Sequence, residues 1–354
     1  MRVYELETPA LIVDLDVLER NSRVMMEAIV KSKANLRPHF KSHKCTEIAK
    51  FQLKNGAIGL TCAKLSEAEA IVRSGISCDL LIANQIVEKS KLDRLAALCK
   101  NNTLTVCVDC VQNVYDLQAA LEKQDSDIGI LIEYEIGMER CGVRTAEEFY
   151  EVYQAVKQCS RLRFRGIQAY AGHISHEVDC EKRLQTIKEN NKNLCALIEF
   201  LTEKGVEVEV VSGASTGTAF EKMNEGIYNE IQAGSYLFLD DCYNKMGLKF
   251  ENSLFVLTTV VSKKENLLVV DAGVKTVGVD QGLPSIKGET CGRVVASEEH
   301  FQFHNPSKQH EIGEKILLIP AHCCSTNNLH EFLYFVKDGV VVKAAKIDGR
   351  GFGK

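Results

Sequence analysis

The chain has 354 residues, of which 45% are hydrophobic and 26% charged, as in a soluble globular protein with one large domain or two smaller ones. Its net charge of −5 argues against nucleic acid as the main partner, because phosphate binding needs a basic surface. Three charges within the first seven residues argue against a secretory signal, and no apolar run is long enough to span a bilayer, so we expect a cytoplasmic protein without membrane contact.

The chain contains 14 cysteines, which is many for its length. Without a secretory signal, a disulfide framework is not expected, and buried thiols behave as small hydrophobic side chains. Cys107 and Cys110 have the spacing of a redox or zinc motif, but no second pair accompanies them and they lie on a strand-like run, "TLTVCVDC". We therefore interpret this pair as structural.

Apolar, β-rich runs alternate with helical patterns along the first two thirds of the chain. Eight such runs occur, at residues 35–41, 56–63, 79–84, 104–109, 127–134, 163–170, 207–213 and 230–238. Between most of them the apolar residues recur at helical spacing, as in 181–204. Eight strand-then-helix units with buried strands predict an α/β fold, a TIM-like (β/α)8 barrel over residues 10–244. A doubly wound open sheet is the alternative.

The pattern changes after about residue 245. The segments 253–280, 313–324 and 329–351 read as strands joined by turns, without a long helix. The sequence therefore predicts a C-terminal β domain over residues 245–354, which residues 1–9 could join.

Titratable and hydroxyl-bearing residues gather where the predicted barrel strands end. The first strand ends in "HFKSHK" (39–44), which holds two histidines and two lysines, and the seventh ends in "SGASTGT" (212–218). The second loop presents backbone N–H groups and hydroxyls, which suit a phosphate. A lysine at one strand end and a phosphate loop at another suggest pyridoxal phosphate (PLP), held as a Schiff base by the lysine.

Several of these segments resemble the metal-assisted D-threonine aldolase and D-serine dehydratase family, which belongs to the PLP enzymes with the alanine racemase-type barrel. "TPALIVDLDVLERN" (8–21) is similar to the opening of that family, "RPHFKSHK" (37–44) to its Schiff-base segment, and "PAHCCSTNN" (320–328) to its metal segment. "SEEH" (297–300) also resembles the family. The resemblance covers nearly the whole chain and implies a homodimer.

Within "RPHFKSHK", the resemblance assigns the Schiff base to Lys41, and Lys44 is interpreted as a solvated residue at a helix start. His39 and His43 are two residues from Lys41 on either side, so on an extended strand they would point to its face. We expect them to support the cofactor rather than to transfer protons.

Within "PAHCCSTNN", the resemblance assigns a divalent metal to His322 and Cys324. They flank Cys323 and would share one face of an extended segment. Imidazole and thiolate suit zinc well and manganese less well, and two protein ligands leave positions open for water and substrate. Zinc and manganese both stay candidates.

The remaining cofactor contacts are implied by the resemblance. Arg140 is expected near the ring oxygen and Tyr170 against the ring. The phosphate cup is expected at Ser212, Gly213, Ser215, Thr216 and Gly217, and Tyr236 is expected to close it.

The reaction implied is the cleavage of a β-hydroxy-D-amino acid, with D-threonine giving glycine and acetaldehyde by a retro-aldol step. "QAYAGHISH" (168–176) resembles the aldolase branch and assigns the base to His176. Cys324 points the other way, toward D-serine or 3-hydroxy-D-aspartate dehydratases. A PLP-binding protein without turnover is a further alternative, but it would not need a β domain or a metal segment. An amino-acid racemase would need a tyrosine base from the β domain.

Overall fold

The computed structural model of the chain describes residues 1–351 and 353. These residues form two units, each with its own sheet. Met26–Lys41 and Ala49–Gly234 make the barrel unit, and Met1–Met25, Ser42–Ile48 and Ser235–Gly351 make the β unit. In the described part of the chain, no helix has the length and apolar character that crossing a membrane requires.

The barrel unit is built on eight parallel strands in the order β2-β9-β8-β7-β6-β5-β4-β3. His39 forms a parallel bridge with Thr61, and the Thr61 N–H donates to the Pro38 carbonyl, so the first strand meets the second and the barrel nearly closes. This confirms the predicted barrel over the open sheet. The strands are β2 (Asn35–Leu36), β3 (Gly59–Cys62), β4 (Asp79–Gln85), β5 (Leu104–Val108), β6 (Ile128–Glu133), β7 (Leu162–Ala169), β8 (Val210–Gly213) and β9 (Glu230–Ile231).

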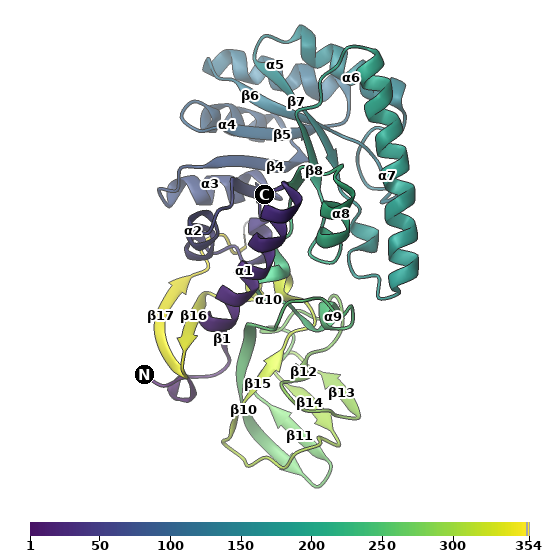
Figure 1. Ribbon diagram of the computed structural model, residues 1–354. Helices are drawn as coiled ribbons and strands as arrows, with labels where there is room; N and C mark the ends of the chain where they lie inside the picture. The colour runs from purple at the N-terminus through teal and green to yellow at the C-terminus, as the bar shows by residue number, and fades with distance from the viewer. Residues whose placement is uncertain (352, 354) are drawn as a thin grey trace. The chain divides into compact units, whose positions relative to one another are not determined.

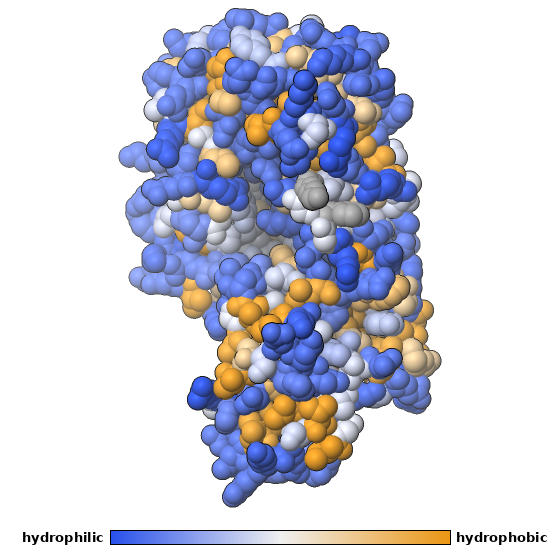
Figure 2. Space-filling model, turned by 180° about the vertical axis from the view of Figure 1, so that it is seen from behind, coloured by the Kyte–Doolittle hydropathy of each residue, from blue (hydrophilic) through white to orange (hydrophobic). Residues whose placement is uncertain are grey.

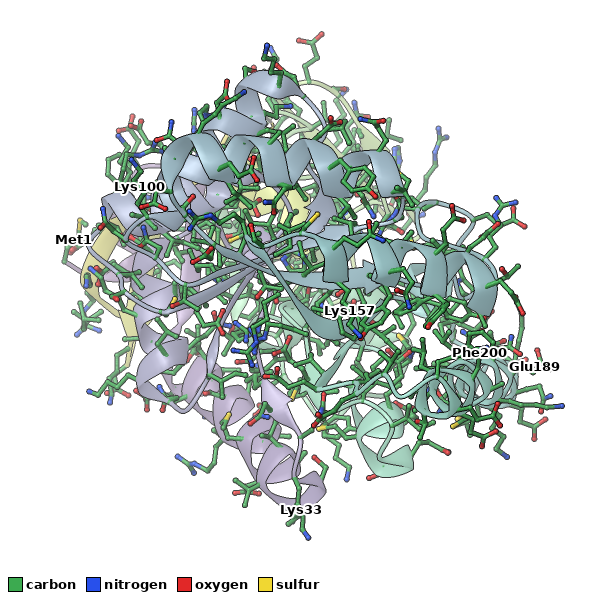
Figure 3. All side chains as sticks on the ribbon, turned by 90° about the horizontal axis from the view of Figure 1, so that it is seen from above. Met1, Lys33, Lys100, Lys157, Glu189 and Phe200 are labelled. Atoms are coloured by element: carbon green, nitrogen blue, oxygen red, sulfur yellow. The ribbon has the colours of Figure 1, made fainter. Side chains whose placement is uncertain are left out.

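Helices follow the strands and cover the outside of the barrel (Figure 1). Seen from above, Glu189 and Phe200 mark α7 at the periphery (Figure 3). Inside, Leu81, Cys107 and Leu131 pack together, which agrees with the structural interpretation of Cys107. The helices are α1 (Leu15–Ser32), α2 (Thr46–Lys54), α3 (Leu65–Arg73), α4 (Lys89–Cys99), α5 (Val111–Gln124), α6 (Ala146–Gln158), α7 (Cys180–Glu203) and α8 (Ala219–Glu225).

The first barrel strand is shorter than the apolar run predicted. β2 ends at Leu36, and Phe40–Ser42 forms a 3-10 turn, η2. Pro38 has no N–H to give to a strand ladder, which explains the early end. Lys41 therefore lies on a turn, and the expectation that His39 and His43 share its face on a strand is wrong. His43 belongs to the β unit, is fully buried, and has its ring edge-on to Phe238 at 6.4 Å.

The β unit holds a nine-stranded sheet with the path β13-β14-β11-β10-β1-β16-β17, to which β15 and β12 are added. Its core packs the start of the chain against the C-terminal strands, with Leu6, Ile12, Phe255 and Leu257 all buried. The strands are β1 (Ala10–Asp14), β10 (Leu254–Lys264), β11 (Leu267–Val270), β12 (Ser285–Ile286), β13 (Arg293–Ala296), β14 (Phe301–His304), β15 (Lys315–Ile319), β16 (Phe332–Lys337) and β17 (Val340–Lys346).

The N-terminal strand belongs to this sheet. β1 pairs antiparallel with β10 and parallel with β16, so residues 10–14 belong here and not to the barrel, for which the sequence suggested 10–244. Short helices complete the chain: η1 (Val3–Glu5), η3 (Gly172–Ile174), η4 (Ser235–Leu237), α9 (Asp241–Asn244) and α10 (Cys323–Leu329).

The surfaces of the two units differ in apolar content. On the face shown in Figure 2, hydrophilic residues cover most of the barrel unit, whereas hydrophobic residues gather over the β unit. Exposed apolar residues of the β unit include Val261, Ile312, Phe332 and Val342.

Candidate active site

A cavity of about 290 Å³ opens in the barrel unit where the parallel strands end. Its wall draws on six strands or the loops after them, because the carboxyl ends of barrel strands converge on one point. Residues that line it include His39, Lys41, Lys64, Gln85, Arg140, Tyr170 and Gln232. Four of these, His39, Lys41, Arg140 and Tyr170, are residues that the sequence assigned to the cofactor site.

Lys41, Arg140 and Tyr170 lie together in this cavity. The Lys41 Nζ and the Arg140 Cζ are each 5.6 Å from the centre of the Tyr170 ring. Arg140 also pairs with Glu133, with 3.5 Å between Nη2 and Oε1, and the Gln85 amide donates to the other Glu133 oxygen at 2.6 Å. Burial raises the pKa of Glu133, although Gln85 and Arg140 oppose the shift. The cavity thus holds two cations against an aromatic face.

Residues 212–218, which form the end of β8 and the loop from β8 to α8, are buried and rich in hydroxyl groups. Ser212, Gly213, Ser215, Thr216 and Gly217 are all buried there. The Thr216 Oγ1 is shielded from solvent and has no hydrogen-bond partner in the described part of the chain. Buried polar atoms normally have partners, so an unpaired hydroxyl in this loop fits a ligand that brings acceptor atoms.

The backbone around Gly213 leaves no room for a side chain at that position. A Cβ on Gly213 would lie 2.3 Å from the Ala169 carbonyl oxygen and 2.8 Å from the Tyr228 ring. Ala214 has φ of 68°, which is uncommon for a residue with a side chain. The close approach at Gly213 and the positive φ of Ala214 show that the loop has a narrowly defined backbone conformation.

His176 and Tyr236, like the loop residues 212–217 and the His322–Cys324 pair, are not among the residues that line the cavity. His176 follows η3 in the barrel unit and is half-buried. Its assignment as the base stays a prediction. Tyr236 belongs to η4 in the β unit, where it is buried with its ring 5.9 Å from that of Phe250. Its expected part in a phosphate cup stays a prediction too.

Below the cavity, five buried side chains form a continuous polar network that the sequence analysis missed. Gln232 Nε2 lies 2.7 Å from Gln168 Oε1 and 2.8 Å from Ser212 Oγ. Ser212 Oγ lies 2.7 Å from Glu230 Oε1, and the other Glu230 oxygen is 2.8 Å from Arg37 Nε. We call these five residues the floor network.

His322 and Cys324 lie in the β unit at the start of α10, and the prediction that their segment is extended is wrong. His322 is the N-cap of the helix, and Cys323 and Cys324 are its first residues. The Asp240 carboxylate accepts the Cys323 backbone N–H at 2.9 Å, which satisfies one of the free N–H groups of the first turn. Cys323 is fully buried, whereas Cys324 is partly exposed.

The His322 ring interacts with the Asp280 carboxylate and with Cys324. Its Nδ1 is 2.6 Å from Asp280 Oδ2, and the other Asp280 oxygen accepts from Ser325 Oγ at 2.5 Å. Burial lowers the pKa of His322, but a hydrogen bond and charge from Cys324 and then from Asp280 outweigh it and raise the pKa to about 10. Because Asp280 bonds Nδ1, a metal held by His322 would bind at Nε2.

The donor set around His322 fits a metal with few protein ligands. An imidazole with a thiol beside it and a carboxylate on its far nitrogen is a common arrangement for zinc. Within residues 1–351 and 353, no group of three or more His, Cys, Asp or Glu side chains gathers as a metal site. Asp280 was missed in the sequence because it lies 42 residues from His322, in a turn.

The segment that continues the chain from Lys41 is tied to α10. The Asn327 amide donates to the Ser42 carbonyl at 2.9 Å, and Cys324 Sγ lies 3.7 Å from Ser42 Oγ. Lys44 donates to Asn328 Oδ1 at 3.0 Å, so it is hydrogen-bonded and not simply solvated as predicted. Within the β unit, α10 therefore packs against the segment that contains Ser42 and Lys44.

Comparison with known proteins covers both units. Residues 13–241 match the family model of the alanine racemase N-terminal domain, and residues 253–336 match that of a serine dehydratase domain. The 3-hydroxy-D-aspartate aldolase of Paracoccus denitrificans (strain Pd 1222) is 39% identical, over 99% of this chain and 93% of that protein. The D-threonine aldolase of Arthrobacter sp is 35% identical, over 98% of this chain and 94% of that protein.

A solved structure gives the same result for the fold. The D-threonine aldolase from Filomicrobium marinum has a TM-score of 0.95 and 36% identity, over 100% of this chain and 98% of that one. The family resemblance inferred from "RPHFKSHK" and "PAHCCSTNN" is thereby confirmed. The chain belongs to the family of the alanine racemase N-terminal domain, and within it to the group of D-threonine and 3-hydroxy-D-aspartate aldolases that join this barrel to a serine dehydratase-type domain.

Proposed function

We propose that the chain is a PLP- and divalent-metal-dependent lyase that cleaves β-hydroxy-D-amino acids by a retro-aldol reaction, with D-threonine giving glycine and acetaldehyde. The observation that carries the proposal is the cavity in which Lys41, Arg140 and Tyr170 lie together at the barrel strand ends. Relatives that match nearly the whole chain and are named aldolases support the same reaction class.

The residues present fit PLP. Lys41 would hold the cofactor through its Nζ, Arg140 would face the ring oxygen, and Tyr170 and His39 would contact the ring. The unpaired Thr216 hydroxyl and its loop would take the phosphate. When bound, PLP supplies an electron sink and the metal a Lewis acid.

The other residues supply binding and proton transfer. His322 Nε2 and Cys324 Sγ would hold the metal, zinc or manganese, with Asp280 fixing the ring of His322. His176 would accept the proton of the β-hydroxyl, after which the Cα–Cβ bond breaks and Cα takes up a proton to give glycine. The alternative is dehydration of D-serine or 3-hydroxy-D-aspartate, in which the Cα proton leaves first.

One observation favours a second substrate, 3-hydroxy-D-aspartate. The cavity is lined by three cations, Lys41, Lys64 and Arg140, and by no carboxylate among the described residues. Arg140 is paired with Glu133, whereas Lys64 makes no ion pair with any residue that the structure describes. An acidic substrate side chain would find its counter-charge in Lys64, and its cleavage would give glycine and glyoxylate.

The test is to incubate the pure protein with D-threonine, 3-hydroxy-D-aspartate and D-serine, with and without a chelator. We expect aldehyde and glycine from the first two substrates, none from the L-isomers, and none after chelation. Lys64→Met should lower kcat/KM for 3-hydroxy-D-aspartate about tenfold or more, as for a lost charged hydrogen bond, and leave D-threonine nearly unchanged. Pyruvate and ammonia from D-serine, with no aldehyde from D-threonine, would contradict the aldolase proposal and support the dehydratase.

A further inference from the structure

All five residues of the floor network are buried in the barrel unit. The exposed fraction is 2% for Arg37, 4% for Glu230, 0% for Ser212, 3% for Gln232 and 2% for Gln168. Its members are Arg37 directly after β2, Gln168 on β7, Ser212 on β8, Glu230 on β9 and Gln232 directly after β9. Buried networks of this kind are stable only when each donor meets an acceptor, so the direction of every bond in it is constrained.

The charged end of the network determines that direction. Glu230 is 2.8 Å from the guanidinium of Arg37 and, as a carboxylate, can only accept hydrogen bonds. The Ser212 hydroxyl, 2.7 Å away, must therefore donate its single proton to Glu230. Its oxygen is then left as an acceptor.

The direction of the Ser212 bond also determines the direction of the hydrogen bond between Gln232 and Ser212. Because Ser212 has no proton left, the Gln232 atom that lies 2.8 Å from it must be the amide nitrogen. The same nitrogen donates to Gln168 Oε1 at 2.7 Å. The carboxamide oxygen of Gln232 therefore turns away from the network, and no residue in the described part of the chain donates to it. Gln232 also lines the cavity, so its free acceptor belongs to the cavity floor.

We infer that Gln232 offers this oxygen to the ring nitrogen of the cofactor and holds that nitrogen in its protonated form. The inference rests on the proposed function. PLP has four polar groups, and three are already matched: the aldehyde by Lys41, the phosphate by the loop with Thr216, and the ring oxygen by Arg140. The ring nitrogen is the one that remains, and an acceptor can bond to it only when it carries a proton.

The chemical consequence is a stronger electron sink, since a protonated ring withdraws electrons from the reacting carbon more than a neutral ring does. Gln232 would touch the cofactor directly. Ser212 and Glu230 act through it as positioning residues, because they decide which end of its carboxamide faces the cavity.

The experiment reads the ring nitrogen itself. The protein is loaded with PLP labelled with ¹⁵N in the ring, and the ¹⁵N chemical shift distinguishes the protonated from the neutral nitrogen. We expect the protonated form in the unaltered protein and in Gln232→Glu, which keeps an acceptor, and the neutral form in Gln232→Leu. Gln52→Leu removes another buried glutamine of the barrel unit and should change nothing.

Glu230→Gln provides a second variant with almost the same side-chain volume. An amide at this position can donate to Ser212, which frees the Ser212 proton for Gln232 and lets the whole network reverse. We expect this variant to bind PLP with a neutral ring nitrogen. A merely structural role for Glu230 would leave the nitrogen signal where it was.

A binding measurement gives an independent check. The unaltered protein should bind PLP about ten to a hundred times more tightly than its 1-deaza analogue, and Gln232→Leu should lose that preference. A neutral nitrogen in the unaltered protein, or a signal unchanged in both Gln232→Leu and Glu230→Gln, would overturn the inference and leave the proposed function intact. Failure of the unaltered protein to bind PLP at all would overturn both.

Discussion

The cavity of the barrel unit and the His322–Cys324 pair of the β unit are built in opposite ways. The cavity collects single residues from six strands or the loops after them, and its floor network is buried. The His322–Cys324 pair comes from three consecutive residues at a helix start, and its support comes from Asp240 and Asp280, far away in sequence. The residues that line the cavity are far apart in sequence, yet they lie over one buried network. His322 and Cys324 are close in sequence, yet they depend on two residues that are distant in sequence.

The largest expected effect is on the barrel side. Lys41→Ala should remove the visible absorption band of bound PLP and lower aldehyde release by more than the factor of about 10²–10⁴ expected for a single general base. Borohydride reduction and mass spectrometry of the unaltered protein should place the label on Lys41. Lys44→Ala, whose amine bonds Asn328, is the control and should keep the label. A label on Lys44 would show that the assignment is wrong.

The β unit gives the next largest effect. His322→Ala and Cys324→Ala should each reduce activity to the metal-free level while the PLP band persists, because the metal and the cofactor have separate ligands. Cys323→Ala is the matched control, since the thiol of Cys323 is fully buried and should cost stability rather than metal. Metal content per chain and the visible spectrum measure the two effects separately. If Cys323→Ala lost the metal and Cys324→Ala kept it, the ligand assignment would have to be exchanged.

His176→Phe tests the base within the barrel unit. We expect aldehyde release from D-threonine to fall by about 10²–10⁴, with PLP and metal both retained. His173→Ala, three residues earlier in the same loop, should have little effect. Stopped-flow measurement of the spectral change on substrate binding separates binding from cleavage. A full-rate His176→Phe enzyme would remove His176 from the mechanism.

The smallest effect concerns the distant support of His322. Asp280→Ala should weaken metal binding about 10–100-fold, because the carboxylate fixes the ring of His322, the proposed metal ligand. Titration with zinc or manganese against a chelator of known affinity measures the change. Asp338→Ala, an exposed acidic residue in the turn between β16 and β17, is the control. Equal metal affinity in Asp280→Ala and the unaltered protein would mean that the Asp280–His322 contact does not serve the metal.

Strand positions could be predicted because buried parallel strands read as continuous apolar runs. All eight barrel strands lie within or overlap the predicted runs, and β5 is buried along its whole length. The ends were less accurate, since Pro38 stops β2 after two residues. The place of β1 could not be read locally, because an apolar strand looks the same whether it pairs in a barrel or with β10 and β16.

The same limit applies to the site. That Lys41, Arg140 and Tyr170 would lie together could be predicted, because their segments resemble those of the family and each comes after a barrel strand. Gln168 and Gln232 could not, because a glutamine near a strand end is common and their contact joins residues 64 apart. The His322–Cys324 pair was predicted from an extended segment that proves to be a helix start. Their geometry depends on Asp240, whose carboxylate accepts the Cys323 N–H and which the motif does not contain.

The unpaired hydroxyl of Thr216 has a thermodynamic consequence. A buried polar group without a partner costs about 1–3 kcal/mol, and the folded chain carries that cost as long as nothing bonds to the hydroxyl. A phosphate that accepts its proton removes the cost only in the folded state. If PLP binds as proposed, folding and PLP binding should be linked, and the melting temperature should rise with the free PLP concentration by mass action. Thr216→Val removes the hydroxyl. Without cofactor, the variant should be more stable than the unaltered chain, and with PLP bound it should be less stable than the unaltered chain.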